Sequence, residues 1–124
     1  MKIYIASAMF TEQEQDRINE IAKLLRAMGH EVYVPHEYKV PLADEMENEE
    51  WAMQVFKHDV ENLDQADAVY YFCEGMHGDI GAAWECGYAY AKGKRIFVDE
   101  LEYDTEISLM VAQSANNEIS GYQS

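Results

Sequence analysis

The chain has few basic residues. Lysine and arginine together number 9 against 24 aspartates and glutamates, so the 124-residue chain carries a formal charge of −15. This charge repels polyanions and anionic lipid surfaces at long range, which argues against binding to nucleic acid or to a membrane. A neutral or cationic small molecule is the better ligand class. The acidic run DEMENEE at residues 44–50 is typical of a solvated loop and helix start.

Cysteines and long apolar segments are scarce as well. Two cysteines, Cys73 and Cys86, exclude a disulfide-rich fold and suit a reducing compartment. With His58 and His77 they lack the paired spacing of a zinc site, so we expect no metal and no cofactor. No apolar run approaches the ~20 residues that span a bilayer. The run before the N-terminal Ala-Ser-Ala is too short for a signal peptide, and we expect a cytoplasmic protein.

Short apolar runs alternate with segments of helical spacing along the chain. The first helix has a capping-box signature, Thr11 with Glu14, and its pattern stops at Gly29. The strands predicted from apolar runs cover residues 2–6, 31–34, 68–73 and 94–98, with a further one near Glu118 and Ile119. The other predicted helices cover residues 49–65, 79–92 and, for a short one, 106–113.

This alternation predicts a single α/β domain over residues 1–124, with a doubly wound parallel sheet of about five strands covered on both faces. Ligands of such sheets bind beyond the carboxyl ends of the strands. The loops at residues 7–10 and 74–81 should therefore meet at the site. A chain of this size often takes part of its cleft from a second subunit, so an oligomer is expected.

Glu85 is a misfit in its helix. In GDIGAAWECGYAYAKGK, residues 78–94, it is the only charge between Ile80 and Ala91, and its neighbours three and four positions away are small residues or tyrosine. Burial of a carboxylate costs several kcal/mol unless it is paired or hydrogen-bonded. A functional role is favoured on this ground. The alternative is an ion pair with Lys92 or Arg95 at the helix edge.

Asp79 is placed to cap the start of the same helix, where its carboxylate would accept backbone N–H groups. Its second oxygen could face a ligand hydroxyl. The spacing of Gly75, Gly78 and Gly81 suggests a phosphate cradle at a helix start. However, two acids, Glu74 and Asp79, and the absence of a Walker lysine argue against one.

Three further positions are candidates with ordinary alternatives. Asp59 lies next to the apolar stripe of its helix, so it either faces the cleft or is a surface charge. Tyr4 lies in a strand buried on both faces, so its hydroxyl needs a partner, which could be backbone. Met9 and Phe10 would form an apolar lid over a flat ring, or would only pack within their loop.

Three stretches, IYIASAMFTEQE, HDVENLDQADAV and DIGAAWECGYAYAKGK, together resemble the nucleoside 2-deoxyribosyltransferases. The likeness covers nearly the whole chain in order, and the D-x-G-x-x-x-E-x-G-x-A core is fairly specific. The resemblance implies a flavodoxin-like sheet and transfer of 2-deoxyribose between nucleobases, with a deoxynucleoside and a free nucleobase as ligands.

The resemblance also implies roles for individual residues. Glu85 would be the nucleophile at C1′ of the sugar, and Tyr4 would donate a hydrogen bond to it. Asp59 would bind the base and protonate it as it leaves. Asp79 would bind the 5′-hydroxyl. The small residues Gly81, Ala82 and Ala89 lie on the same face as Glu85 and would leave space for a sugar beside it.

The C-terminal region leaves the substrate open. The resemblance implies an oligomer, from dimer to hexamer, in which a C-terminal segment of a neighbouring subunit completes the pocket; residues 107–110, with Ser108 and Met110, match that segment. Members that use free nucleosides commonly have Asn at Ser108. The related 2′-deoxynucleoside 5′-phosphate N-hydrolases have serines here and in place of Asp79. Ser108 therefore favours the hydrolases, whereas the carboxylate of Asp79 would repel a phosphate.

A third possibility is a non-catalytic nucleoside- or nucleotide-sensing domain of the same fold, which would keep the cleft but would not need Glu85. If the pocket admits an acceptor base, the outcome is transfer; if it admits water, the outcome is hydrolysis. Base preference depends on the surroundings of Met9, His36, Glu37 and Trp51, and the sequence leaves it open.

Overall fold

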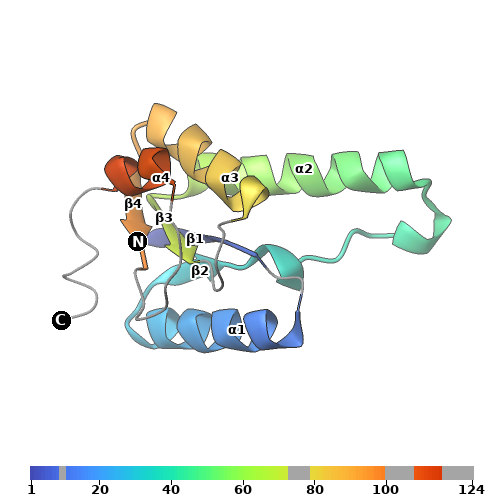
Figure 1. Cartoon of the computed structure of the whole chain (residues 1–124). Coiled ribbons are helices and arrows are strands. Elements are labelled where there is room, and N and C mark those ends of the chain that lie inside the picture. Colours follow the sequence, from blue (N-terminus) through green and yellow to red (C-terminus); the bar gives the residue numbers. More distant parts are fainter. Residues whose placement is uncertain (9–10, 73–78, 100–107, 116–124) are drawn as a thin grey trace.

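A four-stranded parallel sheet forms the centre of the computed structural model, which describes residues 1–8, 11–72, 79–99 and 108–115. The strand order is β2-β1-β3-β4 (Figure 1). The strands are β1 (Lys2–Ser7), β2 (Glu31–Tyr33), β3 (Ala68–Phe72) and β4 (Arg95–Val98). The predicted parallel sheet is confirmed with four strands in the described residues rather than about five. The strand expected near Glu118 and Ile119 falls outside the described residues.

Helices cover both faces of this sheet (Figure 1). The helix α1 (Glu12–Ala27) lies on one face, and α2 (Asn48–Gln65), α3 (Ile80–Ala91) and α4 (Leu109–Ser114) lie on the other. Two short 3-10 turns, η1 (Pro35–Glu37) and η2 (Ala43–Glu45), join β2 to α2. The order β2-β1-β3-β4 is that of a flavodoxin-like doubly wound sheet, whose ligand crevice opens where the winding reverses, between β1 and β3.

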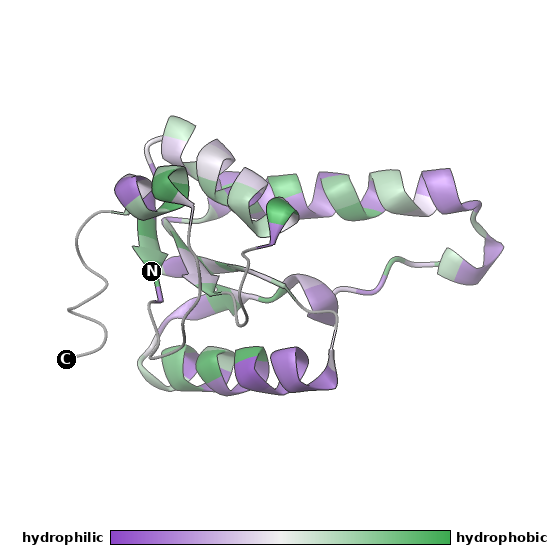
Figure 2. Cartoon of the chain, viewed as in Figure 1, coloured by the Kyte–Doolittle hydropathy of each residue, from purple (hydrophilic) through white to green (hydrophobic). Residues whose placement is uncertain are grey.

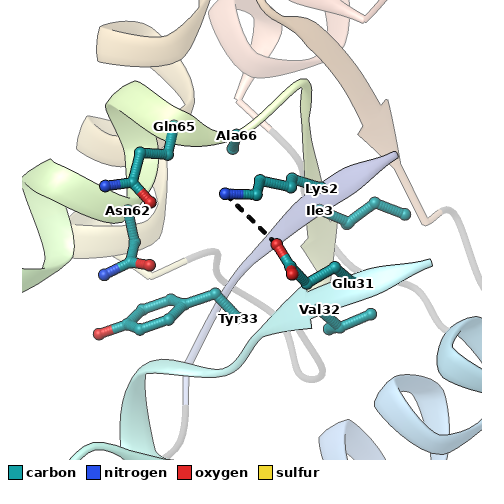
Figure 3. Close-up of a pocket in the computed structure, with 8 residues that line it drawn as sticks. All are labelled: Lys2, Ile3, Glu31, Val32, Tyr33, Asn62, Gln65 and Ala66. Carbon is teal, nitrogen blue, oxygen red and sulfur yellow. Dashed lines mark ion pairs between the residues drawn. The ribbon is translucent and has the colours of Figure 1, made fainter.

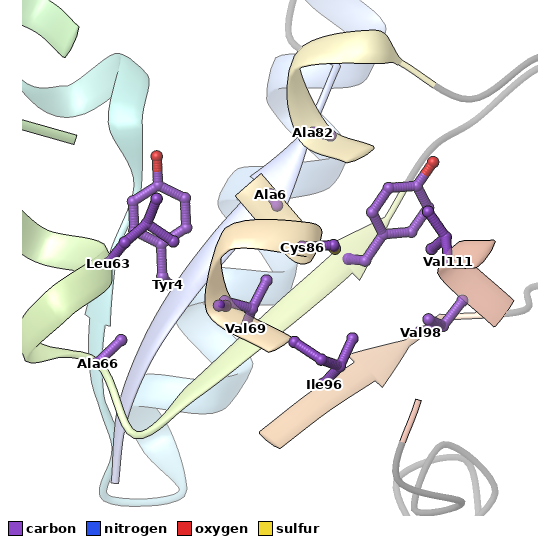
Figure 4. Close-up of a cluster of buried hydrophobic side chains, with 12 residues drawn as sticks. Tyr4, Ala6, Leu63, Ala66, Val69, Ala82, Cys86, Ile96, Val98 and Val111 are labelled. Carbon is purple, nitrogen blue, oxygen red and sulfur yellow. The ribbon is translucent and has the colours of Figure 1, made fainter. Parts of the chain in front are cut away.

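Alternation along β1 divides its side chains between two cores. Ile3 and Ile5 face α1, while Tyr4 and Ala6 belong to the core under α2, α3 and α4 (Figure 4). Tyr4 is fully buried. Its place in the strand thus directs its phenol ring towards the helices that carry the candidate acids.

The first and third helices begin as their sequences predict. Thr11 and Glu14 form the capping box of α1, and Asp79 caps α3 by accepting the N–H of Ala82. The small side chains Ala82 and Ala89 are buried against the sheet. They fill the helix–sheet interface. The prediction that these two alanines leave space for a sugar beside Glu85 is therefore wrong.

The helix α2 is longer than the surface it covers. Its N-terminal half extends past the sheet in Figure 1, and apolar and polar residues alternate along its whole length in Figure 2. The apolar residues whose spacing predicts this helix are Ala52, Met53, Phe56, Val60 and Leu63. Of these only Leu63 is buried, whereas Met53 and Phe56 are 53% and 52% exposed. The spacing predicted the helix correctly, but its outer half is covered only in part: Phe56 contacts Trp84 of α3 with ring centroids 5.7 Å apart, and Trp51 and Val55 line a pocket. None of the described helices is long and apolar enough to cross a membrane.

Candidate active site

The carboxylate of Glu85 is hydrogen-bonded to a buried tyrosine. The hydroxyl of Tyr4, from β1, donates to Oε2 of Glu85, which projects from α3. This is the contact that the family resemblance implied, and it gives the misfit charge a partner other than Lys92 or Arg95. Burial raises the pKa of Glu85 to about 7; the Tyr4 hydrogen bond opposes this, and the charges of Asp59 and Asp79 add to it. Catalytic roles for these residues remain predictions.

A second tyrosine holds the second acid. The register of the sheet places Tyr33 of β2 opposite Tyr4 of β1, and their rings stack with centroids 5.2 Å apart. The Tyr33 hydroxyl donates to Oδ1 of Asp59 over 2.8 Å. Asp59 is therefore a half-buried group facing the site and not a free surface charge. Burial raises the pKa of Asp59, while the Tyr33 hydrogen bond and the charge of His58 lower it.

The carboxylate of Asp59 lies close enough to that of Glu85 to affect its ionisation. The negative charge of Asp59 is one of the causes that raise the pKa of Glu85. Burial is the main reason why the pKa of the Tyr4 phenol is raised, and the negative charges of Glu85 and Asp59 raise it further. Such effects of one charge on another group require proximity in a poorly solvated region. The sheet thus brings together two acids that are 26 positions apart in the chain.

A histidine and another tyrosine extend this cluster. Nδ1 of His58 lies 2.7 Å from the Tyr33 oxygen, and the ring of Tyr38 stacks on the imidazole with centroids 3.4 Å apart. Sequence reasoning considered His58 only as a zinc candidate and did not identify Tyr33 or Tyr38. Their place depends on which residue of β2 lies opposite Tyr4, which no local pattern reveals. The described residues contain no group of three or more His, Cys, Asp and Glu side chains placed to hold a metal ion.

Asp79 caps the start of α3 with one of its two carboxylate oxygens. Oδ2 of Asp79 accepts the N–H of Ala82 at 2.8 Å, and among the described residues Oδ1 has no hydrogen bond. A Cβ atom at Gly81 would lie 3.1 Å from Oδ2, which is closer than most real contacts, so the glycine allows this cap. The predicted capping role of Asp79 is confirmed. Binding of a sugar hydroxyl through Oδ1 remains a prediction.

A pocket of about 530 Å³ opens at the carboxyl ends of β1 and β2. It adjoins the acid cluster through Tyr38, which stacks on His58. Ser7 contributes a buried hydroxyl that has no partner among the described residues. The lining residues are Ser7, Pro35, His36, Tyr38, Lys39, Val40, Ala43, Trp51 and Val55. His36 and Trp51, which were expected to influence base preference, are among them; Met9 and Phe10 lie outside the described residues.

A smaller pocket of about 140 Å³ lies at the opposite, amino end of the same strands (Figure 3). An ion pair between Lys2 and Glu31 crosses it at 3.4 Å. The ring of Tyr33 lines this pocket, but its hydroxyl points away from Lys2 in Figure 3, towards the acid cluster. The ligand-binding edge predicted from strand direction is therefore the one with the larger pocket.

The C-terminal candidates lie on another side of α3. Ser108 caps α4 by accepting the N–H of Met110 at 3.2 Å, and Met110 is 79% exposed. Met110 lines an apolar pocket of about 220 Å³ with Ala83 and Tyr90 of α3. These α3 residues point roughly opposite to Glu85 on a helix of 3.6 residues per turn. Within one chain, Ser108 and Met110 are not part of the acid cluster; their place in a neighbouring site remains a prediction.

A pair of neighbouring carboxylates, each bound by one of two stacked tyrosines in a doubly wound sheet, is typical of enzymes that act on glycosidic bonds. The family model for nucleoside 2-deoxyribosyltransferase matches residues 3–116. The chain belongs to this family.

Solved structures agree with this assignment. A 2-deoxyribosyltransferase from the psychrotolerant bacterium Bacillus psychrosaccharolyticus is 31% identical, with a TM-score of 0.77 over 93% of this chain and 82% of that one. A CMP N-glycosidase from Clostridium botulinum is 26% identical, with a TM-score of 0.57 over 79% and 70%. A conserved protein from Enterococcus faecalis V583 is 19% identical, with a TM-score of 0.72 over 92% and 85%, and shows the fold alone. No curated protein matches the chain significantly. The protein is thus an enzyme of the glycosyl-transferring or glycosyl-hydrolysing type that acts on nucleosides.

Proposed function

We propose that the protein transfers 2-deoxyribose between nucleobases through a covalent ester of C1′ with Glu85. One observation carries the proposal: two acids from different helices, Glu85 and Asp59, are each held by a tyrosine hydroxyl, and the two tyrosine rings stack on each other. This arrangement suits a retaining displacement, in which one carboxylate attacks the anomeric carbon and the other exchanges a proton with the leaving group.

In the first half-reaction an oxygen of Glu85 bonds to C1′ while the bond from C1′ to the base nitrogen breaks. Asp59 gives its proton to the departing base, so the base leaves as a neutral molecule. In the second half-reaction a nitrogen of the acceptor base attacks C1′, its proton passes to Asp59, and Glu85 is released as a carboxylate. Two inversions give net retention at C1′.

Tyr4 orients the nucleophile. Its hydroxyl donates a hydrogen bond to Oε2 of Glu85, so Oε1 is the oxygen that would attack C1′. Burial disfavours the carboxylate, since it raises the pKa of Glu85 to about 7. An ionised carboxylate that is poorly solvated is a stronger nucleophile than one in water. The tyrosine hydrogen bond limits this effect enough for the charge to exist near neutral pH.

The remaining contacts would position the substrate. Oδ1 of Asp79, at the start of α3, would accept a hydrogen bond from the 5′-hydroxyl, and Gly81 leaves the Asp79 carboxylate room in its capping position. The flat base would lie in the 530 Å³ pocket, against Trp51 and Tyr38. Met9 and Phe10 would close the pocket from the loop after β1.

A second candidate is hydrolysis of 2′-deoxynucleoside 5′-monophosphates. Ser108 and the similarity to a CMP N-glycosidase favour it. Against it, Asp79 would place a carboxylate where the phosphate binds, in a chain with a net charge of −15. We therefore prefer the free deoxynucleoside as substrate.

The test is a product assay. The protein is incubated with deoxyinosine and adenine, and separately with deoxynucleoside monophosphates, and bases and nucleosides are separated by chromatography. The transferase is expected to form deoxyadenosine and hypoxanthine. Free base from the monophosphate alone would establish the hydrolase instead. The Glu85→Gln variant should lose turnover, whereas Glu61→Gln, at an exposed position of α2, should keep it.

The same proposal includes a homo-oligomer. Several large apolar side chains are exposed in the single chain, among them Trp51, Phe56, Trp84 and Met110. Burying them against a second copy would remove apolar surface from water. It would also let the segment with Ser108 and Met110 reach a neighbouring site, as the family resemblance implies.

A further inference from the structure

The acid cluster consists of Glu85 and Asp59 with the tyrosines and the histidine that contact them. One member, His58, has no role in the proposed reaction. The Tyr33 oxygen lies 2.8 Å from Oδ1 of Asp59 and 2.7 Å from Nδ1 of His58. A phenol has one proton and can donate it to only one of these two neighbours. When Tyr33 donates to Asp59, the close contact with His58 requires a proton on Nδ1, which then donates to the Tyr33 oxygen.

We propose that His58, Tyr33 and Asp59 form a proton relay that supplies the proton given to the leaving base, an inference that rests on the proposed function. The proton on Nδ1 of the imidazolium passes to the Tyr33 oxygen, while the proton of Tyr33 passes to Oδ1 of Asp59. The imidazolium and carboxylate become a neutral imidazole and a carboxylic acid, and Tyr33 ends with one proton as it began. Asp59 then protonates the base.

The surroundings of His58 hold its ring in place for this transfer. The Tyr38 ring lies parallel to the imidazole, with centroids 3.4 Å apart and an angle of 5° between the planes. Asn62, one turn along α2, donates to the His58 carbonyl at 2.9 Å and lies farther, 3.5 Å, from Nδ1. The groups facing His58 are thus one phenol on its edge, one ring on its face, one amide and the Asp59 carboxylate. His58 is only half-buried, so it can exchange protons with water.

Asp59 needs a supply of protons because the proposed reaction requires one acid to be protonated while its neighbour is ionised. Glu85 must be ionised while Asp59 carries a proton, although burial raises the pKa of both carboxyl groups. Asp59 therefore needs a source of protons at a pH at which Glu85 is a carboxylate, and its hydrogen-bonded neighbour is the Tyr33 hydroxyl. Histidine side chains bind and release a proton near neutral pH. A proton held on His58 would have to pass only the Tyr33 hydroxyl to reach Asp59.

The relay also returns the proton. In the second half-reaction the acceptor base, or water in hydrolysis, gives a proton to Asp59 as it attacks C1′. The same two shifts in reverse restore the Tyr33 phenol and the His58 imidazolium. A full cycle consumes no proton from solution at this site.

Two variants and a matched control test the relay. Tyr33→Phe removes the hydroxyl but keeps the ring stacked on Tyr4. His58→Asn keeps an N–H near the position of Nδ1 but carries no additional proton. The control is Tyr88→Phe, which removes a different bond from a tyrosine to an acid of α2, from the Tyr88 hydroxyl of α3 to Asp64 at 2.6 Å, outside the site.

The readout is kcat/KM for base release between about pH 5 and 9. Histidine titrates near neutral pH and carboxylic acids at lower pH. Tyr33→Phe and His58→Asn should therefore move the alkaline limb to lower pH by about one unit or more. General acid catalysis contributes about 10²–10⁴-fold, so the rate near pH 8 should fall by about 10-fold or more, and the rate near pH 5.5 should approach that of the unmodified enzyme. Tyr88→Phe should retain the original profile.

An equal loss at every pH, or no loss, would overturn the relay, because a merely structural Tyr33 or His58 does not change the shape of the profile. An unmodified enzyme that releases no base would overturn the proposed function, and the relay with it. Nitrogen NMR of the His58 ring, assigned with His58→Asn, provides a measurement that does not depend on the folding of Tyr33→Phe. The relay requires a protonated Nδ1 in the resting enzyme, and a bare Nδ1 throughout the active pH range would exclude it.

Discussion

Tyr4 and Tyr33 lie side by side on β1 and β2, and each hydroxyl donates to a different carboxylate. Their rings stack with centroids 5.2 Å apart, while the acceptors, Glu85 and Asp59, come from two different helices. The pairing of two adjacent strands thus sets the relative position of two acids. Because both phenols are held by the sheet, neither carboxylate needs a charged partner to remain in the site.

Replacing Glu85 with glutamine should stabilise the fold while abolishing activity. Folding raises the pKa of this group from 4.5 to about 7, so the folded chain holds the proton more tightly than the unfolded chain. The free energy of unfolding should therefore fall as pH rises through this interval. Glutamine carries no charge, and Glu85→Gln should gain on the order of 1–3 kcal/mol at pH 8 and little at pH 4.

Urea unfolding at both pH values measures this difference. Glu61→Gln, at an exposed position, should show no comparable pH-dependent gain. A Glu85→Gln protein that is no more stable than the original at pH 8 would contradict the burial argument.

Removing the Tyr4 hydroxyl should shift the acidic limb of activity. The hydrogen bond from Tyr4 lowers the pKa of Glu85 relative to burial alone. In Tyr4→Phe that pKa should rise further above 7, and the nucleophile should ionise only at higher pH. The pH profile of kcat/KM should move to the alkaline side, with a loss of about tenfold or more near pH 7. A profile displaced towards acid would contradict the assignment of Glu85 as the nucleophile.

Asp59→Asn should lose turnover on substrates whose base needs a proton to leave. General acid–base catalysis contributes about 10²–10⁴-fold, so kcat should fall by that order for deoxyinosine. A deoxynucleoside whose base already carries a positive charge, such as 7-methyl-2′-deoxyguanosine, should be affected much less. Equal losses with both substrates in single-turnover assays would argue for a binding role alone.

Two glycines in α3 offer a matched pair. A Cβ at Gly81 would lie 3.1 Å from Oδ2 of Asp79, whereas a Cβ at Gly87 meets nothing within 4 Å. Gly87→Ala should stabilise the protein by about 0.5–1 kcal/mol through helix propensity. Gly81→Ala should lack this gain, because it disturbs the Asp79 cap, and should raise KM for the deoxynucleoside. Thermal unfolding and steady-state kinetics compare the two; equal stabilisation would show that Asp79 tolerates the methyl group.

Exchange of the C-terminal segment between subunits predicts complementation. If Met110 serves a neighbouring site, an inactive Met110→Glu variant mixed with inactive Glu85→Gln should regain part of the activity. In hybrid oligomers some sites combine the intact Glu85 of one chain with the intact Met110 of the other. Mixtures that are refolded together and remain inactive, or a monomeric mass by light scattering, would contradict the shared site.

Patterns among neighbouring residues were enough to predict the helices and strands and to single out Glu85 as a candidate site residue. The alternation of apolar runs with helical spacing, the capping box of Thr11 with Glu14 and the cap at Asp79 depend only on nearby residues, and all three are present in the structure. Glu85 could be singled out because it is the only charge in an otherwise uncharged helix.

Only the tertiary structure decided what surrounds the two acids and which parts of the apolar pattern are covered. Tyr4 meets Glu85 across 81 positions and Tyr33 meets Asp59 across 26, and both contacts depend on strand register and on which face each helix covers. The same holds for α2, whose periodic stripe predicted a buried face although Phe56 is half exposed. A local pattern records which side of an element is apolar, but the partner that covers that side is set by the arrangement of the whole sheet.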